Sequence, residues 1–103
     1  MCLYISSEVI LANILSKKDG VSIREIMAYC ETLKKELSNS ERGVYVNVNH
    51  DELRSALSRC SSEFRFFRGQ YLVNNGINLK HFNARYDDSV SRVLEEVALR
   101  FCG

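Results

Sequence analysis

The stretch that decides the fold is Gly20-Val21-Ser22-Ile23-Arg24-Glu25-Ile26. Ser22 and Glu25 have the spacing of a capping box, in which each side chain accepts a hydrogen bond from the other residue's backbone N–H. Val21 and Ile26 flank them at the spacing of a hydrophobic staple. The sequence therefore predicts that a helix begins here and ends near residues 38–40. Its predicted buried face comprises Ile23, Met27, Cys30, Leu33 and Leu37.

Towards the N-terminus, the residues from about Ser7 to Ser16 predict another helix. The segment from Val9 to Leu15 is apolar except at Asn13, so we expect this helix to be buried around most of its circumference. Residues 17–20, Lys-Lys-Asp-Gly, close it, because cations suit the negative end of a helix and glycine commonly follows that end.

Towards the C-terminus, the alternation over Val44–Val48 indicates a short strand or an extended link. Asn49 and Glu52 then repeat the capping box, which predicts a third helix from about His50 to Ser61. The residues expected to be buried are Leu53, Ala56, Leu57 and Cys60. The residues expected on its exposed face are Arg54, Ser55, Ser58 and Arg59.

Two further elements follow. Phe64–Phe67 and Gln70–Val73 flank Arg68-Gly69, the pattern of a β-hairpin with a tight turn. Leu79–Tyr86 has no clear pattern. Asp87 or Asp88 then caps a final helix, with an apolar stripe formed by Val90, Val93, Leu94, Val97, Ala98 and Phe101.

The composition indicates one ordered domain covering residues 1–103. The chain has 46% hydrophobic and 26% charged residues and a formal net charge of +1, so affinity for nucleic acid would have to come from a local patch. Cys2, Cys30, Cys60 and Cys102 are widely spaced, which favours free thiols in a reducing, cytoplasmic compartment over zinc or disulfides. We expect no membrane span, metal, cofactor or small-molecule ligand.

The order of helix, capped helix, capped helix and aromatic hairpin resembles winged helix-turn-helix domains, and most closely the HARE-HTH group, which includes the N-terminal domain of the RNA polymerase delta subunit. The matching residues are the stretch 20–26, then Leu53, Ala56 and Leu57, then 64–66 and 69–72. The resemblance implies a mainly helical α+β fold, with a three-helix core and wing over residues 5–74. Two features depart from it: the long connection over Asn39–Val48 and the additional C-terminal helix at 87–103.

This resemblance implies a transcription-related regulator that binds double-stranded DNA. Transferred residue by residue, its contacts would be Arg54, Ser55, Ser58 and Arg59 on the third helix and Arg65 and Arg68 on the wing. The alternative is a protein–protein interaction module that binds no DNA. The stripe on the C-terminal helix could complete the domain's own core, which we favour, or form a homodimer.

We do not expect an enzyme. Cys30 and Cys60 lie on apolar helix faces, and capping accounts for His50 beside Asp51. Tyr71 and the three phenylalanines of the hairpin could stack on single-stranded bases, although the pattern favours core positions for them.

Overall fold

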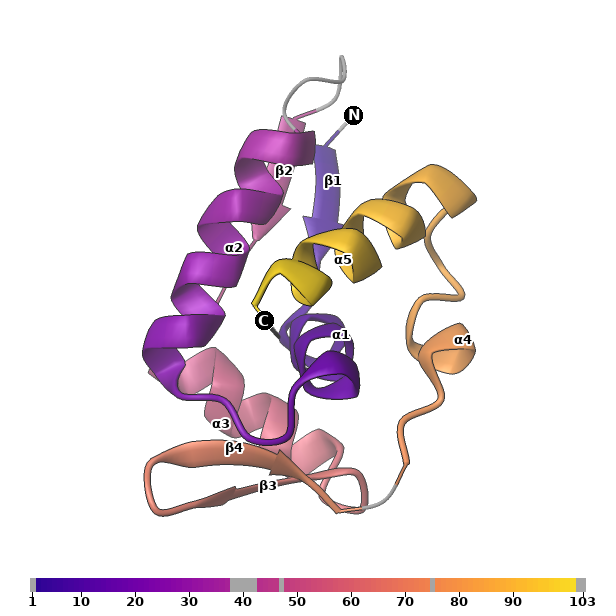
Figure 1. The fold of residues 1–103 in the computed structure, drawn as a ribbon. Helices are drawn as coiled ribbons and strands as arrows, with labels where there is room; N and C mark the ends of the chain where they lie inside the picture. The colour runs from indigo at the N-terminus through magenta and orange to yellow at the C-terminus, as the bar shows by residue number, and fades with distance from the viewer. Residues whose placement is uncertain (1, 38–42, 47, 75, 102–103) are drawn as a thin grey trace.

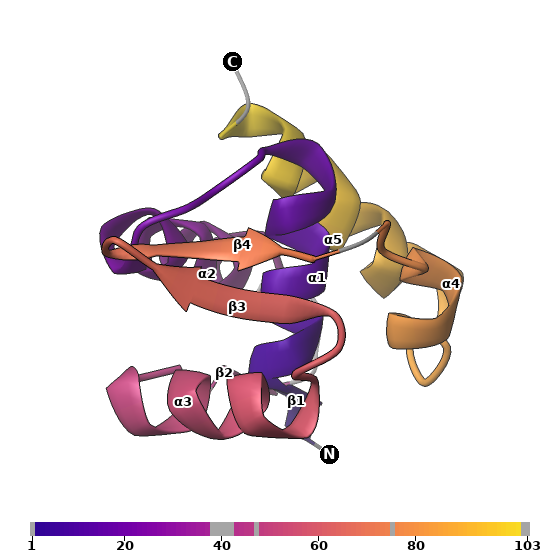
Figure 2. The ribbon, with the colours of Figure 1, turned by 90° about the horizontal axis from the view of Figure 1, so that it is seen from below.

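Helix α1 (Ser7–Lys17) lies at the centre of the molecule, with the other elements arranged around it (Figures 1 and 2). The computed structural model describes residues 2–37, 43–46, 48–74 and 76–101. Within them the chain forms β1 (Cys2–Ile5), α1, α2 (Ile23–Leu37), β2 (Gly43–Val46), α3 (His50–Arg59), β3 (Phe64–Phe67), β4 (Gln70–Val73), α4 (Leu79–Phe82) and α5 (Asp88–Arg100). The architecture is therefore α+β and mainly helical, as the sequence predicts.

The apolar run in α1 is buried on nearly all sides, which confirms the prediction from its composition. All residues from Val9 to Leu15 are at most 4% exposed, because α2, α3, α4 and α5 all pack against this helix. The chain leaves α1 through Gly20, whose φ of +87° lies in the left-handed region that favours glycine. A Cβ at this position would lie 2.9 Å from Oε1 of Gln70 on β4.

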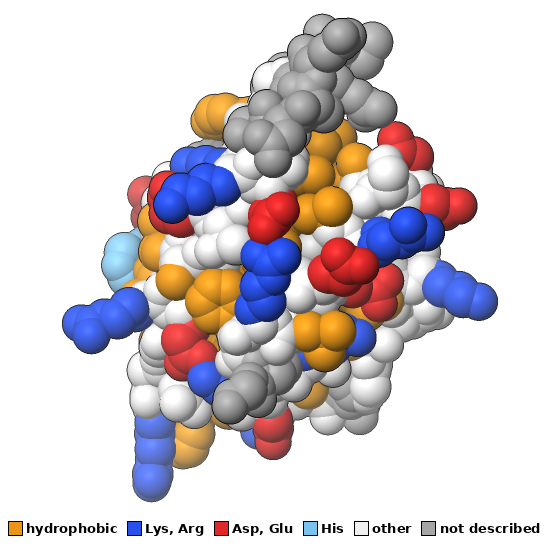
Figure 3. Space-filling view, turned by 45° about the horizontal axis from the view of Figure 1, so that its top comes forward, with side chains coloured by type: hydrophobic (Ala, Val, Ile, Leu, Met, Phe, Trp, Pro, Cys, Tyr) orange, Lys and Arg blue, Asp and Glu red, His pale blue; other side chains and the backbone are white. Residues whose placement is uncertain are grey.

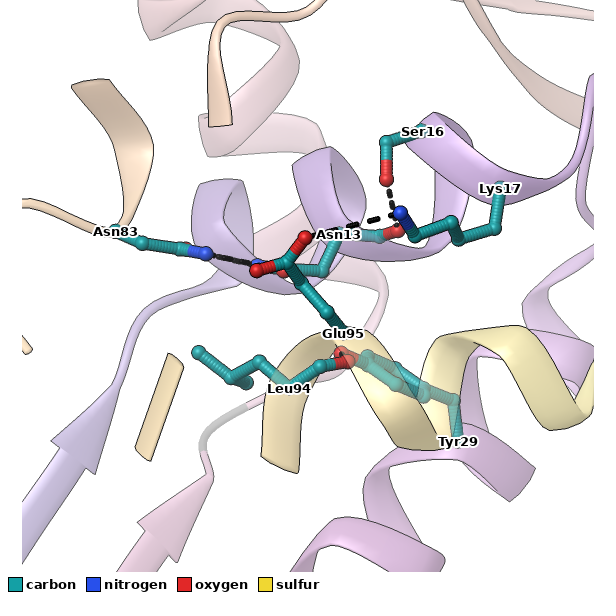
Figure 4. Close-up of polar contacts among 7 residues, drawn as sticks. All are labelled: Asn13, Ser16, Lys17, Tyr29, Asn83, Leu94 and Glu95. Atoms are coloured by element: carbon teal, nitrogen blue, oxygen red, sulfur yellow. Dashed lines mark hydrogen bonds and ion pairs between the residues drawn. The ribbon is translucent and has the colours of Figure 1, made fainter. Parts of the chain in front are cut away.

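One polar pair crosses this core. Asn13 donates from Nδ2 to the carbonyl of Val9 at 2.8 Å and to Oδ1 of Asn83 at 2.9 Å, and Asn83 returns a hydrogen bond at 3.2 Å (Figure 4). Asn83 directly follows α4, so the pair fixes this four-residue helix against α1. The sequence alone assigned no structure to this segment.

Helix α2 begins as the capping box predicts. The N–H of Glu25 donates to Oγ of Ser22 at 3.3 Å, and the N–H of Ser22 donates to the Glu25 carboxylate at 3.4 Å. The prediction that Met27 is buried is wrong, because its side chain is 40% exposed. The buried face is centred instead on Tyr29, whose hydroxyl donates to the carbonyl of Leu94 on α5 at 2.8 Å (Figure 4). The fully or nearly fully buried residues of α2 are Ile26, Tyr29, Cys30, Leu33 and Leu37. The expected end near residues 38–40 lies outside the described residues.

A parallel pair of strands, β1 and β2, was only half predicted. The strand expected at Val44–Val48 is present as β2, but its partner β1 was not anticipated. Ile5 and Val46 point into the core, whereas Tyr4 and Tyr45 stack on the outer face with ring centroids 5.7 Å apart.

The hairpin β3–β4 has the predicted register and turn. Phe67 pairs with Gln70, so Arg68 and Gly69 form a two-residue turn with positive φ at both positions, +53° and +77°. Val21 extends this sheet, because it exchanges backbone hydrogen bonds with Tyr71 of 3.0 and 2.7 Å. The hairpin is thereby tied to the connection between α1 and α2.

Helix α5 packs its apolar stripe against α1 and α2, as the favoured interpretation predicts. Asp87 caps it by accepting a hydrogen bond from the N–H of Val90 at 2.9 Å. Leu94 and Ala98 are fully buried, and Val93 and Phe101 are partly buried at the edges of the stripe. The last helix therefore completes the core of this chain.

Candidate nucleic-acid interface

Helix α3 lies on the opposite side of α1 from α5 (Figure 2), and its exposed residues are polar. The Asn49 side chain accepts a hydrogen bond from the N–H of Glu52 at 2.9 Å, so the predicted cap sets the start of the helix. Leu53 and Ala56 are buried against the core, and Leu57 and Cys60 are half-buried. This anchoring leaves Arg54, Ser55, Ser58 and Arg59 exposed, as predicted. The helix ends at Arg59, slightly before the expected end at Ser61.

The two arginines of α3 have different surroundings. Nη2 of Arg59 lies 2.8 Å from the carboxylate of Glu8, so this side chain ties the end of α3 to the start of α1. Burial alone would raise the pKa of Glu8, but the hydrogen bonds that its carboxylate accepts and the positive charge of Arg59 together lower it. Arg54 makes no ion pair with any residue in the described ranges. Arg54 is therefore the arginine of α3 most available to a ligand.

Helix α3 lies next to the hairpin and contacts β3 (Figures 1 and 2). Burial raises the pKa of the Tyr71 hydroxyl, and the positive charge of Arg54 opposes that rise. The predicted recognition helix and the predicted wing are therefore neighbours in the fold.

The hairpin arginines, Arg65 and Arg68, are both exposed. As on α3, one of the two is engaged by internal hydrogen bonds among the described residues and the other is not. Nη1 of Arg65 donates to Oδ1 of Asn74 at 2.8 Å and to the carbonyl of Val73 at 3.3 Å, so part of its donor capacity is used. The guanidinium of Arg68 lies over the ring of Phe67, 5.1 Å from its centroid. This cation–π contact leaves the N–H groups of Arg68 available.

The aromatic residues of the hairpin divide into two pairs. Phe64 and Tyr71 are buried, which confirms the core positions expected for them. The same expectation is wrong for Phe66 and Phe67, which are 53% and 56% exposed. The reason is geometric: the strands continue past the edge of the core, so the phenylalanines nearest the turn are only partly covered by their neighbours. An alternation pattern shows which residues share a face, but not where the core ends.

The face formed by α2 and α5 offers a contrast. Its Lys and Arg side chains are interspersed with Asp and Glu (Figure 3). Arg100 pairs with Glu36 at 2.6 Å, and Lys17 pairs with Glu95 at 3.7 Å. Charges neutralised in this way attract a polyanion weakly. The side with α3 and the hairpin is therefore the better candidate for a nucleic-acid interface.

Among the residues that the structure describes, Cys30, Cys60 and the acidic side chains form no comparable site. Burial raises the pKa of the Cys30 thiol to about 12 and also raises the pKa of Cys60, so both thiols are held in their unreactive form. Within residues 2–37, 43–46, 48–74 and 76–101, no cluster of three or more His, Cys, Asp or Glu side chains could hold a metal ion. In the same ranges, every helix is too short or too polar to cross a bilayer.

Comparisons of the chain with protein-family models, with curated proteins and with solved structures found no match.

Proposed function

We propose that the chain is a winged-helix domain that binds double-stranded DNA, with α3 entering the major groove and the β3–β4 hairpin lying on the sugar–phosphate backbone. In such a complex, base edges are contacted from the helix, and phosphate contacts fix its position. A transcription-related regulatory role follows from this mode of binding as part of the proposal.

The observation that carries the proposal is the position of Arg54. It is exposed on α3, it has no ion-pair partner among the described residues, and α3 itself contacts β3 of the hairpin. A guanidinium placed there can donate two hydrogen bonds to a guanine edge or to a phosphate. Ser55 and Ser58 lie on the same exposed face and add hydroxyl groups that can donate to or accept from bases.

The hairpin supports the same placement. Arg68 stands at its turn, and the Val21–Tyr71 pairing fixes the hairpin relative to the rest of the domain. A preorganised second contact reduces the conformational entropy that is lost on binding. Arg59 and Arg65 belong to the same interface in this proposal, but each must first exchange an internal partner for a phosphate.

The test is fluorescence anisotropy with a labelled duplex, titrated over a range of salt concentrations. Each phosphate contact contributes about −0.9 to the slope of log K against log salt. Two available arginines, Arg54 and Arg68, therefore predict a slope of about −1.8, and the engagement of Arg59 and Arg65 would raise its magnitude to about 3.6.

Arg54→Ala should weaken binding and reduce the magnitude of this slope by about 0.9 if Arg54 binds a phosphate. Arg92→Ala is the matched control, because Arg92 is exposed on α5, on the other side of α1 from α3 (Figure 2). If the two substitutions change the DNA affinity equally, the assignment of α3 to the interface is wrong. An absence of binding at low salt would overturn DNA binding and favour the alternative function, docking on a protein partner.

A further inference from the structure

The end of the hairpin carries three adjacent exposed side chains, Phe66, Phe67 and Arg68. Both phenylalanine rings are more than half exposed. Exposing two large aromatic rings in consecutive residues forgoes the stabilisation that their burial would give. Their position at the tip of the proposed DNA-binding hairpin suggests what they contact.

The strand register places the two rings on opposite faces of the hairpin. Phe66 pairs with Tyr71 and Phe67 with Gln70, and successive residues of a strand point to opposite sides. Each ring is supported by one neighbour. The centroid of Phe66 lies 4.8 Å from that of Tyr71, and the Phe67 ring lies beneath the guanidinium of Arg68. Both rings are therefore held in place while more than half of each side chain stays open to solvent.

The charge around the rings suits a polyanion. The hairpin from Phe64 to Val73 contains two arginines, Arg65 and Arg68, and no acidic residue. Arg54 adds a third positive charge from α3, the helix that contacts β3. Exposed aromatic rings among cations are the combination with which proteins bind unpaired bases, because the rings stack on the bases while the cations hold the phosphates.

An intact duplex gives these rings little to stack on, because its bases are already stacked on one another and its backbone presents charged phosphates. We propose that the hairpin tip stacks on unpaired bases next to the duplex that α3 holds, so the preferred ligand is DNA with a single-stranded segment adjoining a duplex. This inference rests on the proposed function. It adds the class of DNA to that function and assigns the stacking role to Phe66 and Phe67.

The test compares three labelled probes by anisotropy: a blunt duplex, the same duplex with a single-stranded overhang, and the overhang strand alone. Stacking of one base on one ring strengthens binding roughly 5-fold to 100-fold. The wild-type chain should therefore bind the overhang probe at least about 5-fold more tightly than the blunt duplex. A fluorescent adenine analogue in the overhang should lose emission as it stacks.

Two kinds of substitution separate stacking from simple apolar contact. Phe66→Ala and Phe67→Ala should each reduce the ratio of overhang affinity to blunt-duplex affinity. This ratio is the readout because Phe67 supports Arg68, a proposed duplex contact, so Phe67→Ala also affects blunt-duplex binding. Phe67→Leu keeps an apolar side chain but removes the aromatic face, so it should behave like Phe67→Ala. Leu99→Ala is the matched control, since Leu99 is 56% exposed on α5. Phe66 packs on the buried Tyr71, whereas Phe67 contacts the exposed Arg68, so the Phe67 variants provide the test if Phe66→Ala disturbs the hairpin.

The outcomes distinguish the two proposals. If the blunt duplex binds in an Arg54-dependent way and the overhang adds nothing, the inference about unpaired bases is wrong and the proposed function stands. A preference for the overhang that survives both alanine substitutions also overturns the inference. If no probe binds, both proposals fail, and the exposed rings would then belong to a surface for a protein partner.

Discussion

Truncation of Leu94 to alanine tests whether the last helix completes the core. Leu94 is fully buried on α5, which packs against α1 and α2. The substitution removes three carbons, which at about 0.8 kcal/mol for each buried methylene gives about 2.4 kcal/mol of lost transfer free energy. The cavity left behind raises the expected loss to about 3–5 kcal/mol. For a domain of this size, a loss of 3 kcal/mol lowers Tm by roughly 12–24 °C.

The assay is urea unfolding followed by circular dichroism at two protein concentrations. The control is Leu99→Ala on the same helix, which should change the free energy of unfolding by less than about 0.5 kcal/mol because Leu99 is mostly exposed. The unfolding midpoint should not depend on protein concentration. A loss below about 1 kcal/mol for Leu94→Ala, accompanied by conversion of a dimer to a monomer, would refute the assignment of the stripe to the core and make it a homodimer interface.

Three other predictions follow from single contacts. Gly20→Ala should destabilise the domain by more than about 1 kcal/mol in the same unfolding assay, because it places a side chain at positive φ and against β4; an unchanged midpoint would contradict this. Tyr29→Phe should cost about 1–2 kcal/mol through loss of the hydrogen bond to Leu94, whereas a cost near zero would show that the bond contributes nothing. Hydrogen bonding to Lys18 lowers the pKa of Glu25. The pair therefore stabilises the fold fully at pH values above the ordinary pKa of a glutamate, and this stabilisation is lost as the pH falls through the lowered pKa. Glu25→Gln should therefore reduce the slope of stability against pH in this acidic window, and identical slopes for variant and wild type would refute the assignment.

Local signals in the sequence were enough to predict most element boundaries. Ser22, Asn49 and Asp87 each accept a hydrogen bond from an N–H three residues later, so each helix start is encoded within four residues. The hairpin was equally local, since Arg68-Gly69 between alternating strands determines both turn and register. These features depend on near neighbours in the chain, which a pattern can show.

Features that depend on distant residues were missed. Strand β1 forms only because Cys2–Ile5 meets Gly43–Val46, and no local pattern links the two segments. The apolar spacing in α2 fits either of two neighbouring faces of the helix, and the prediction buried the face that includes Met27. The structure instead buries the face that includes Tyr29, whose hydroxyl donates a hydrogen bond to α5.

For the candidate interface, the sequence predicted the exposed face of α3 but not the state of its arginines. The partner of Arg59 is Glu8, 51 residues away, so its engagement could not be anticipated. Similarly, the exposure of Phe66 and Phe67 depends on how far the hairpin extends past the core. A sign of this was already present in Arg68-Gly69, because a turn directly after two phenylalanines places them at the tip.

The measurement that most directly tests the central claim is NMR mapping of backbone amides during titration with duplex DNA at low salt. The account predicts that the largest chemical-shift changes fall on Arg54, Ser55 and Ser58 of α3 and on Arg68 at the hairpin turn, with small changes on α5. Changes concentrated on α5 or on the β1–β2 pair, or no changes at all, would contradict it.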